Sequence, residues 1–440
     1  MTEPEMASVA TARLGILKSL AILVLGLCPW PPDWGRLRDV VDSARSPEFN
    51  RADRDGHAEG YYEGLIRGGH GSATARYDAS QRLIGKPNGW IPFQDADVVH
   101  YLDGDFLQFE LKPLVERVLF GKPFSTNAFG MHDGPLTKQK PAGTLRIAVL
   151  GSSMDMGWGV TYQDTYINQL EEWLNSRSLR QQQVMPRRYE VLNFAVAAYS
   201  PMQRLETLRR KVMAFQPDLV IYSATTLDTR LMEIHLCDML RKRIDLKYDF
   251  LREATTTAAV NDDDLRVDAG GEMINKSRLK QKLRPLYWGI YDRTLSAIAG
   301  DCRVAGVPIV MVIIPRVGKA DSPLKRAEPV ARLKAIAAHH ALTIFDLSDA
   351  FDAFDPSKIE IAAWDDHPNA LGHRRLFRSL ARAMDNDPDI RDLLFASGHK
   401  LSASNTAHAS REQSPLDTEP SAAKHPESPG ANTGSVGESP

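Results

Sequence analysis

Ser153 and His367 are the two residues whose sequence surroundings could support nucleophilic chemistry. Ser153 lies in "VLGSSMDMGWGV", where an apolar run ends at Gly151 and two further glycines, Gly157 and Gly159, follow closely. A serine hydroxyl becomes a nucleophile when a base removes its proton, an acid orients the base, and N–H donors stabilise the oxyanion. Serine is also a common turn residue, so the alternative for Ser153 is a small side chain that fills a tight turn.

The segment "AAWDDHPNALGHRRL" supplies the candidate base. His367 follows two aspartates and precedes Pro368, a residue type that suits the first turn of a helix, so we expect His367 just before a helix begins. A neighbouring carboxylate would fix the imidazole tautomer and stabilise the imidazolium formed during attack. The alternative is a histidine that only satisfies backbone donors, beside acidic residues that favour a helix start.

Strand and helix patterns alternate between residue 145 and about residue 390. Apolar, β-rich runs cover 145–150, 189–194, 218–223, 308–314 and 342–345, and helical spacing covers 167–174, 205–215, 277–304 and 324–340. Continuous apolar strands that alternate with helices predict a parallel, doubly wound sheet covered on both faces. Right-handed crossovers then place all strand C-termini along one edge, where ligands bind in such sheets. We expect the active site there.

At these residues the sequence resembles the SGNH/GDSL hydrolase family. "RIAVLGSSMDMGWGV" is similar to the block Gly-Asp-Ser-x-x-x-Gly-x-Gly that carries the nucleophile, so it matches Ser153 to that residue and puts Ser152 in place of the aspartate. "VLNFAVAAYS" is similar to the second block, with Asn193 at its asparagine, and "WDDHPNALGH" resembles the last block, with His367 as the base. "STNAFGMHD" is like the segment that precedes the first block in many bacterial members.

The resemblance spans roughly residues 125–385. It implies an α/β fold of flavodoxin-like type, with a doubly wound parallel sheet in a three-layer α/β/α sandwich. It also implies ester hydrolysis or acyl transfer without a metal or other cofactor. The implied oxyanion donors are the backbone N–H groups of Ser153 and Ala198, where Ala198 stands in place of the family's glycine. Alanine keeps that N–H and is costly only if its φ is positive.

One departure from the family concerns the third block. "DLVIYSATTLDTR" puts Leu227 where the family has its oxyanion asparagine and keeps only Asp228 of that motif. Losing one oxyanion donor costs about 10² to 10³ in rate in serine enzymes. We therefore expect Thr226, or its neighbour Thr225, to replace the missing donor.

The acid of the triad is the second point to decide. The family often places it three residues before the histidine, which here is Trp364, but branches linked to polysaccharide acetylation use a two-residue spacing that fits Asp365. Asp366 is adjacent to His367 and would normally point elsewhere. The resemblance thus implies Ser153, His367 and Asp365 as the catalytic residues.

The composition is ordinary for a soluble protein. The chain has 440 residues, 43% of them hydrophobic and 25% charged, and a formal net charge of -2, so nothing in its charge favours nucleic acid or an anionic membrane as partner. The cysteines, Cys28, Cys237 and Cys302, lie far apart and form no zinc-like pair, although one disulfide is possible. No P-loop, dinucleotide fingerprint or metal-ligand spacing occurs.

Trp158 either lines the substrate pocket or covers the turn.

The sequence predicts four parts. Residues 1–30 contain the apolar stretch "SLAILVLGLCPW" and form a signal or membrane-anchor segment, with a buried N-terminal helix as the alternative. Residues 31–143 form an N-terminal extension, either packed on the main domain or acting as a lid. Residues 144–395 form the SGNH-like catalytic domain. Residues 396–440 carry almost no large apolar side chains and form a disordered tail.

Together these features predict an extracytoplasmic serine esterase, periplasmic or secreted, with a membrane tether as one form of its N-terminus. By resemblance, its substrate is a small-molecule or carbohydrate ester. Two alternatives stay open: a non-catalytic carbohydrate-binding member of the fold, and an O-acyltransferase that uses the same triad. Neither the oligomeric state nor the acyl chain follows from the sequence.

Overall fold

The computed structural model describes residue 93 and residues 96–180, 187–271, 273–318, 321–362 and 365–395. Three parts of the chain lie outside the described residues: the predicted signal or anchor at 1–30, the extension up to residue 92, and the predicted tail at 396–440. Among the described residues, no helix combines the length and the apolar character needed to span a membrane.

A five-stranded sheet forms the centre of the fold, and all its strand pairs are parallel. Its spatial order is β6-β5-β7-β8-β9, which is the flavodoxin-like order 2-1-3-4-5 when the strands are counted along the chain. The strands are β5 (Thr144–Leu150), β6 (Arg188–Asn193), β7 (Leu219–Ala224), β8 (Ile309–Ile313) and β9 (Thr343–Asp346). These bounds and this order confirm the predicted fold class.

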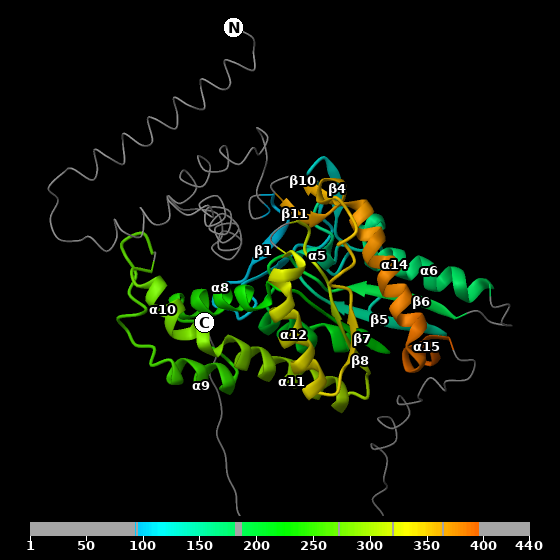
Figure 1. Cartoon of the computed structure of the whole chain (residues 1–440). Helices are drawn as coiled ribbons and strands as arrows, with labels where there is room; N and C mark the ends of the chain where they lie inside the picture. Colours follow the sequence, from blue (N-terminus) through cyan, green and yellow to red (C-terminus); the bar gives the residue numbers. More distant parts are fainter. Residues whose placement is uncertain are drawn as a thin grey trace, which may run out of the picture. The chain divides into compact units, whose positions relative to one another are not determined.

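Helices cover both faces of the sheet, so the fold is a three-layer sandwich (Figure 1). The chain reverses direction across the sheet after β6, and right-handed crossovers therefore put the later helices on the face opposite the first. One layer contains α6 (Tyr166–Arg180) and α14 (Ala370–Asn386), which pack together. The other contains α7 (Pro201–Arg210), α11 (Tyr287–Val304) and α12 (Pro323–His339). Here α8 (Asp228–Arg241) and α9 (Asp249–Thr257) pack against α11, and α10 (Lys276–Leu283) packs against α8.

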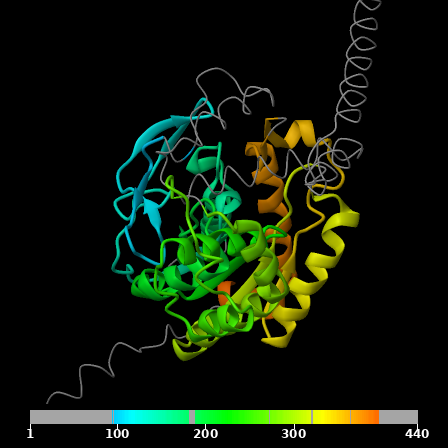
Figure 2. The same ribbon diagram turned by 90° about the vertical axis from the view of Figure 1, so that its left-hand side faces the viewer.

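The described part of the N-terminal extension packs against the sheet domain. It contains two antiparallel hairpins, seen in blue and cyan in Figure 2, made of β1 (Val99–Tyr101) with β2 (Phe109–Leu111) and β3 (Glu116–Leu119) with β4 (Lys122–Ser125). Their apolar side chains share one buried cluster with Trp158 and Ala198. The extension therefore packs directly against the segments that carry the candidate site.

The segment around His367 differs from the prediction in one respect. His367 and Pro368 belong to a short strand, β11 (Asp365–Pro368), which pairs antiparallel with β10 (Glu360–Ala362). Pro368 does not open the next helix, because α14 begins at Ala370 and is capped by Asn369. The Asn369 side chain accepts hydrogen bonds from the first free N–H groups of the helix, which is the usual role of an N-cap asparagine.

The described residues up to Asp387 belong to one compact unit, and those from Pro388 onward belong to a second. Of the second unit, the structure describes the helix α15 (Pro388–Phe395). The predicted boundaries at residues 143 and 395 remain predictions.

Candidate active site

Ser153 is the first residue of α5 (Ser153–Met156), a short helix that follows β5 almost directly. The carboxylate of Asp155 folds back and accepts hydrogen bonds from the backbone N–H of Ser152, at 2.8 Å, and from the hydroxyl of Tyr166, at 2.7 Å. A Cβ atom at Gly151 would lie 2.1 Å from Asp155 Oδ2, so only glycine fits there. This close approach makes the sharp turn that places Ser153 at the carboxyl edge of the sheet.

Trp158 is held between two glycines with left-handed backbone. Gly157 has φ 87° and Gly159 has φ 77°, a region that glycine adopts without a steric penalty. The buried indole of Trp158 donates a hydrogen bond from Nε1 to Oδ2 of Asp365 at 3.0 Å. Trp158 therefore does more than cover the turn, because it binds the predicted acid of the triad.

The structure brings Ser153, His367 and Asp365 into one hydrogen-bonded series. Nε2 of His367 lies 2.7 Å from Oγ of Ser153, although the two residues are 214 positions apart in the chain. Nδ1 of His367 lies 2.5 Å from Oδ1 of Asp365, and the same oxygen accepts the backbone N–H of His367 at 3.0 Å. Ser153 and His367 are only 3% and 4% exposed. Such a geometry permits proton transfer from the hydroxyl to the imidazole.

The electrostatics of the pair favour an imidazolium next to a carboxylate. Burial disfavours an ionised Asp365, but the charge of His367 and the hydrogen bonds from His367 and Trp158 outweigh it and lower the pKa of the Asp365 carboxyl. Burial alone would lower the pKa of His367, yet attraction to Asp365, their hydrogen bond and the charge of Asp366 raise that pKa above its ordinary value. His367 is therefore a stronger base than a free imidazole.

Asp366 has a different partner. Its carboxylate is ion-paired with the guanidinium of Arg316, whose Nε lies 2.8 Å from Oδ2, and its nearest approach to Nδ1 of His367 is 3.9 Å. Asp365, Asp366 and His367 place possible metal-ligand atoms within 4.8 Å of one another. Because Arg316 already occupies the Asp366 carboxylate, this group is better suited to proton transfer than to holding a cation.

The second block supplies the loop opposite Ser153. Asn193 ties the two segments together, since its Nδ2 donates to the backbone oxygen of Asp155 at 3.1 Å and its Oδ1 accepts the N–H of Ala195 at 3.1 Å. Ala198 has φ 63°, so the positive φ that would make alanine costly is present. For a residue with a Cβ this conformation costs about 1–2 kcal/mol. The loop thus adopts a strained conformation at the residue where the resemblance places an oxyanion donor.

The threonines expected to replace the missing oxyanion donor have other partners. The hydroxyl of Thr226 donates to Oδ1 of Asp321 at 2.7 Å, and that of Thr225 donates to Oδ1 of Asp228 at 3.2 Å. A hydroxyl has a single proton to donate, so the structure does not supply the donor expected of Thr226. Leu227 packs against the cluster that contains Trp158. The oxyanion donors that remain from the prediction are the two backbone N–H groups.

Arg204 is a residue of this region that the sequence patterns did not single out. Its buried guanidinium forms an ion pair with Asp228, at 2.8 and 3.0 Å, and donates to the backbone oxygens of Tyr199, at 3.0 Å, and Ser223, at 2.9 Å. It therefore joins the end of β7 to the loop that carries Ala198. The signal in the sequence is an arginine directly before Leu205 in the apolar pattern of α7.

The other buried histidines and the buried cysteines have contacts that suit a structural role. His373 is buried, and its Nδ1 accepts the N–H of Tyr166 at 3.3 Å. His235 lies between the hydroxyl of Ser200 and a backbone oxygen. Cys237 and Cys302 are both buried, and the one disulfide allowed by the cysteine count does not join these two.

Comparison with known proteins gives matches among solved structures alone. The sequence matches no family model and no curated protein. Among solved structures, TesA matches with 13% identity over 54% of this chain and 97% of its own, at a TM-score of 0.35. Axe2, an acetylxylan esterase from Geobacillus stearothermophilus, matches with 15% identity over 54% and 93%, at a TM-score of 0.34. A putative lipolytic protein of the G-D-S-L family from Desulfitobacterium hafniense matches with 9% identity over 54% and 98%, at 0.32.

The matched structures include acetylxylan esterases and a putative lipolytic protein of the G-D-S-L family, each at 16% sequence identity or less. What the site does chemically has to be argued from its own residues.

Proposed function

We propose that this chain is a serine esterase that uses Ser153 as its nucleophile, His367 as its base and Asp365 as the acid that orients the base. The observation that carries the proposal is the continuous series from Ser153 Oγ to His367 Nε2, at 2.7 Å, and from His367 Nδ1 to Asp365 Oδ1, at 2.5 Å. Nucleophile, base and orienting group within hydrogen-bond reach are the geometric signature of nucleophilic catalysis.

The reaction would proceed in two steps. His367 Nε2 takes the proton from Ser153 Oγ while this oxygen forms a bond to the ester carbonyl carbon, and the backbone N–H groups of Ser153 and Ala198 stabilise the oxyanion. The imidazolium then gives its proton to the leaving alcohol, and an acyl-serine remains. A water molecule, deprotonated by His367, releases the acid and restores Ser153. The carboxylate of Asp365 favours the imidazolium in both steps.

For the substrate, we propose a small acyl group on a carbohydrate. The support is the two-residue spacing between Asp365 and His367, which resembles the branches linked to polysaccharide acetylation. We also propose an extracytoplasmic location. Its support is the apolar stretch in residues 1–30 alone.

A second candidate is acyl transfer to a sugar hydroxyl by the same three residues. The observation that favours it is the burial of the site, since Ser153 and His367 are 3% and 4% exposed. If water reaches the acyl-serine slowly, an alcohol bound beside it can accept the acyl group instead.

The two outcomes are separated by one assay on the full chain. We expect the wild type to release p-nitrophenol from p-nitrophenyl acetate, and Ser153→Ala and His367→Ala to lose this activity. Ser176→Ala, which replaces an exposed serine of α6, is the control and should keep the activity. A neutral oligosaccharide in the same reaction becomes acetylated, as detected by mass spectrometry, if the chain is a transferase. No turnover by the folded wild type, with retained binding of the sugar, would support the non-catalytic alternative instead.

A further inference from the structure

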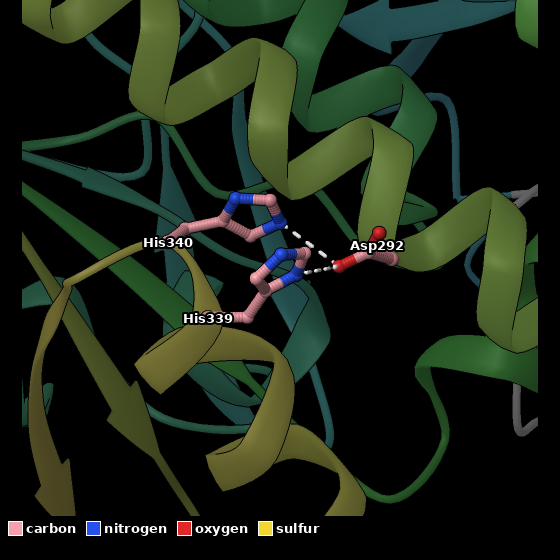
Figure 3. Close-up of side chains that lie close together, drawn as sticks. All are labelled: Asp292, His339 and His340. Atoms are coloured by element: carbon pink, nitrogen blue, oxygen red, sulfur yellow. Dashed lines mark hydrogen bonds and ion pairs between the residues drawn. The ribbon is translucent and has the colours of Figure 1, made fainter.

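We propose that Asp292, His339 and His340 form a surface site for one divalent transition-metal cation such as Zn²⁺. The three side chains come from two helices: Asp292 from α11, His339 from the last position of α12, and His340 from the residue that caps α12. Figure 3 shows both imidazoles turned toward the Asp292 carboxylate. Neither the sequence spacing nor the proposed esterase activity accounts for this arrangement.

The distances between the ligand atoms suit one metal ion. Nε2 of His340 lies 2.9 Å and Nδ1 of His339 lies 3.4 Å from the same oxygen, Oδ1 of Asp292. All three atoms lie within 4.8 Å of one another. Ligand atoms bound at about 2.0–2.2 Å to Zn²⁺ are separated by about 2.9–3.4 Å, depending on the angle at the metal. A cation could therefore be accommodated by small side-chain movements.

The convergence of two adjacent histidines is itself informative. Neighbouring side chains in a regular α-helix point about 100° apart, so they do not normally reach one atom. Here the helix ends between them, and His340 has φ -94° and ψ 12°. The two rings consequently lie only 4.8 Å apart, with a tilt of 34° between their planes. The end of α12 thus directs both imidazoles to one point.

The donor set indicates the class of cation. Two imidazole nitrogens and one carboxylate oxygen suit Zn²⁺, Ni²⁺, Co²⁺ or Cu²⁺, whereas Ca²⁺ and Mg²⁺ prefer oxygen ligands throughout. In the part of the chain that the structure describes, the ion pairs of Asp292 are those with the two histidines, and no lysine or arginine neutralises it. The neighbouring Arg293 pairs with Glu253 instead.

Exposure leaves the site open to an ion from solution. The side chain of His340 is 14% exposed and that of Asp292 is 31% exposed, while His339 stands at the rim with 71%. Three protein ligands leave at least one position for water or for a ligand from another molecule. Such a site can be filled without unfolding any part of the structure.

The position of the site assigns it a structural role. His340 precedes Thr343, the first residue of β9, so it lies at the edge where the parallel strands begin. Ser153 follows β5, at the edge where they end. A cation held by Asp292 and the two histidines would therefore join α11 to α12 and stabilise their packing, and it would not contact the hydroxyl of Ser153.

The test is calorimetric titration of the full, tag-free chain with ZnCl₂, together with thermal unfolding with and without the ion. We expect the wild type to bind one more equivalent of Zn²⁺ than Asp292→Asn and His340→Ala, or to bind that equivalent far more tightly. Losing even an outer-shell partner costs about 10–100-fold in metal affinity, and losing one of three ligands should cost more. His339→Ala should weaken binding in the same direction.

Two controls separate this site from other histidines. His100→Ala removes an exposed imidazole of β1, and His367→Ala removes the histidine that lies beside Asp365 and Asp366. Both variants should keep the bound equivalent of Zn²⁺ that His340→Ala loses. Zn²⁺ should also raise the melting temperature of the wild type but not that of His340→Ala. Melting curves without metal establish that each variant folds. Equal stoichiometry and affinity in the wild type, Asp292→Asn and His340→Ala would overturn the proposal, as would a wild type that binds no Zn²⁺.

Discussion

The indole Nε1 of Trp158 lies 3.0 Å from Oδ2 of Asp365, although 207 positions separate the two residues in the chain. The other oxygen of the same carboxylate, Oδ1, faces the imidazole of His367. Both oxygens of the predicted acid are therefore held, one by the base and the other by the turn that carries the nucleophile. This arrangement fixes the orientation of Asp365 relative to His367.

Replacing Trp158 by phenylalanine should slow the esterase reaction. Trp158→Phe keeps an aromatic ring between the two glycines but removes the N–H that orients Asp365. We expect kcat to fall about tenfold, the lower end of the loss seen when an outer partner that orients a site residue is removed. The measurement is steady-state hydrolysis of p-nitrophenyl acetate. Trp173→Phe, on α6, is the matched control, and equal kcat values for both variants would show that the indole N–H has no role.

The two aspartates before His367 should differ strongly in effect. Asp365→Asn removes the carboxylate that binds Nδ1 and should lower kcat by about 10⁴-fold, because the imidazole loses the partner that sets its tautomer. Asp366→Asn removes a carboxylate whose hydrogen-bonding partner is Arg316, and its kcat should stay within about tenfold of the wild type. If Asp366→Asn lowered kcat more than Asp365→Asn, the acid of the triad would be Asp366.

The pH profile of the reaction should reflect the raised pKa of His367. Only neutral imidazole can accept the proton of Ser153, so kcat/KM should rise with pH and level off above this pKa, which is raised from the ordinary value of histidine. The charge of Asp366 also raises the pKa of His367, so the acidic limb should move to lower pH in Asp366→Asn. A limb that moves to higher pH in this variant would contradict the electrostatic account.

The buried pair of Arg204 and Asp228 should matter for stability. Asp228→Ala leaves the Arg204 guanidinium buried without its counter-charge, which should cost about 3–5 kcal/mol of unfolding free energy. Asp97→Ala breaks an exposed pair with Lys112 and should leave the urea midpoint nearly unchanged. Urea unfolding followed by circular dichroism measures the midpoint of each variant. Similar midpoints for Asp228→Ala and Asp97→Ala would mean that solvent reaches the Arg204 guanidinium.

Acid should destabilise the fold through His373. Burial lowers the pKa of His373 to about 3, so below the ordinary pKa of histidine the unfolded chain binds a proton that the folded chain does not. The free energy of unfolding should then fall as pH decreases from about 6.5 toward 3, by up to about 1.4 kcal/mol per pH unit for this residue. His373→Gln lacks this contribution, so its stability should decline less between pH 7 and pH 4.5. Parallel declines in both proteins would rule out a titrating His373.

The strands of the central sheet could be predicted because each is a continuous apolar run covered on both faces. Ile147 and Ile221, for example, are fully buried at the centre of β5 and β7. The sequence motifs also placed Ser153 and His367 near the same edge. The start of α14 is predicted less well, since the helix begins at Ala370, after the N-cap Asn369, and not at Pro368.

Contacts between distant segments could not be predicted in the same way. The partner of Thr226 is Asp321, the partner of Trp158 is Asp365, and the carboxylate near His340 is Asp292. No local spacing records such pairs, because they depend on how helices and loops pack after the chain has folded. Arg204 is similar, since an arginine in a helix is usually solvated unless the fold brings a carboxylate to it.

The central claim, that Ser153 is an activated nucleophile, is tested most directly with a fluorophosphonate probe and peptide mass spectrometry. We expect one covalent adduct on the wild-type chain, located on Ser153, no adduct in Ser153→Ala, and labelling slowed by at least about 10²-fold in His367→Ala. A folded wild type that stays unlabelled, or an adduct that persists in Ser153→Ala, would contradict the account.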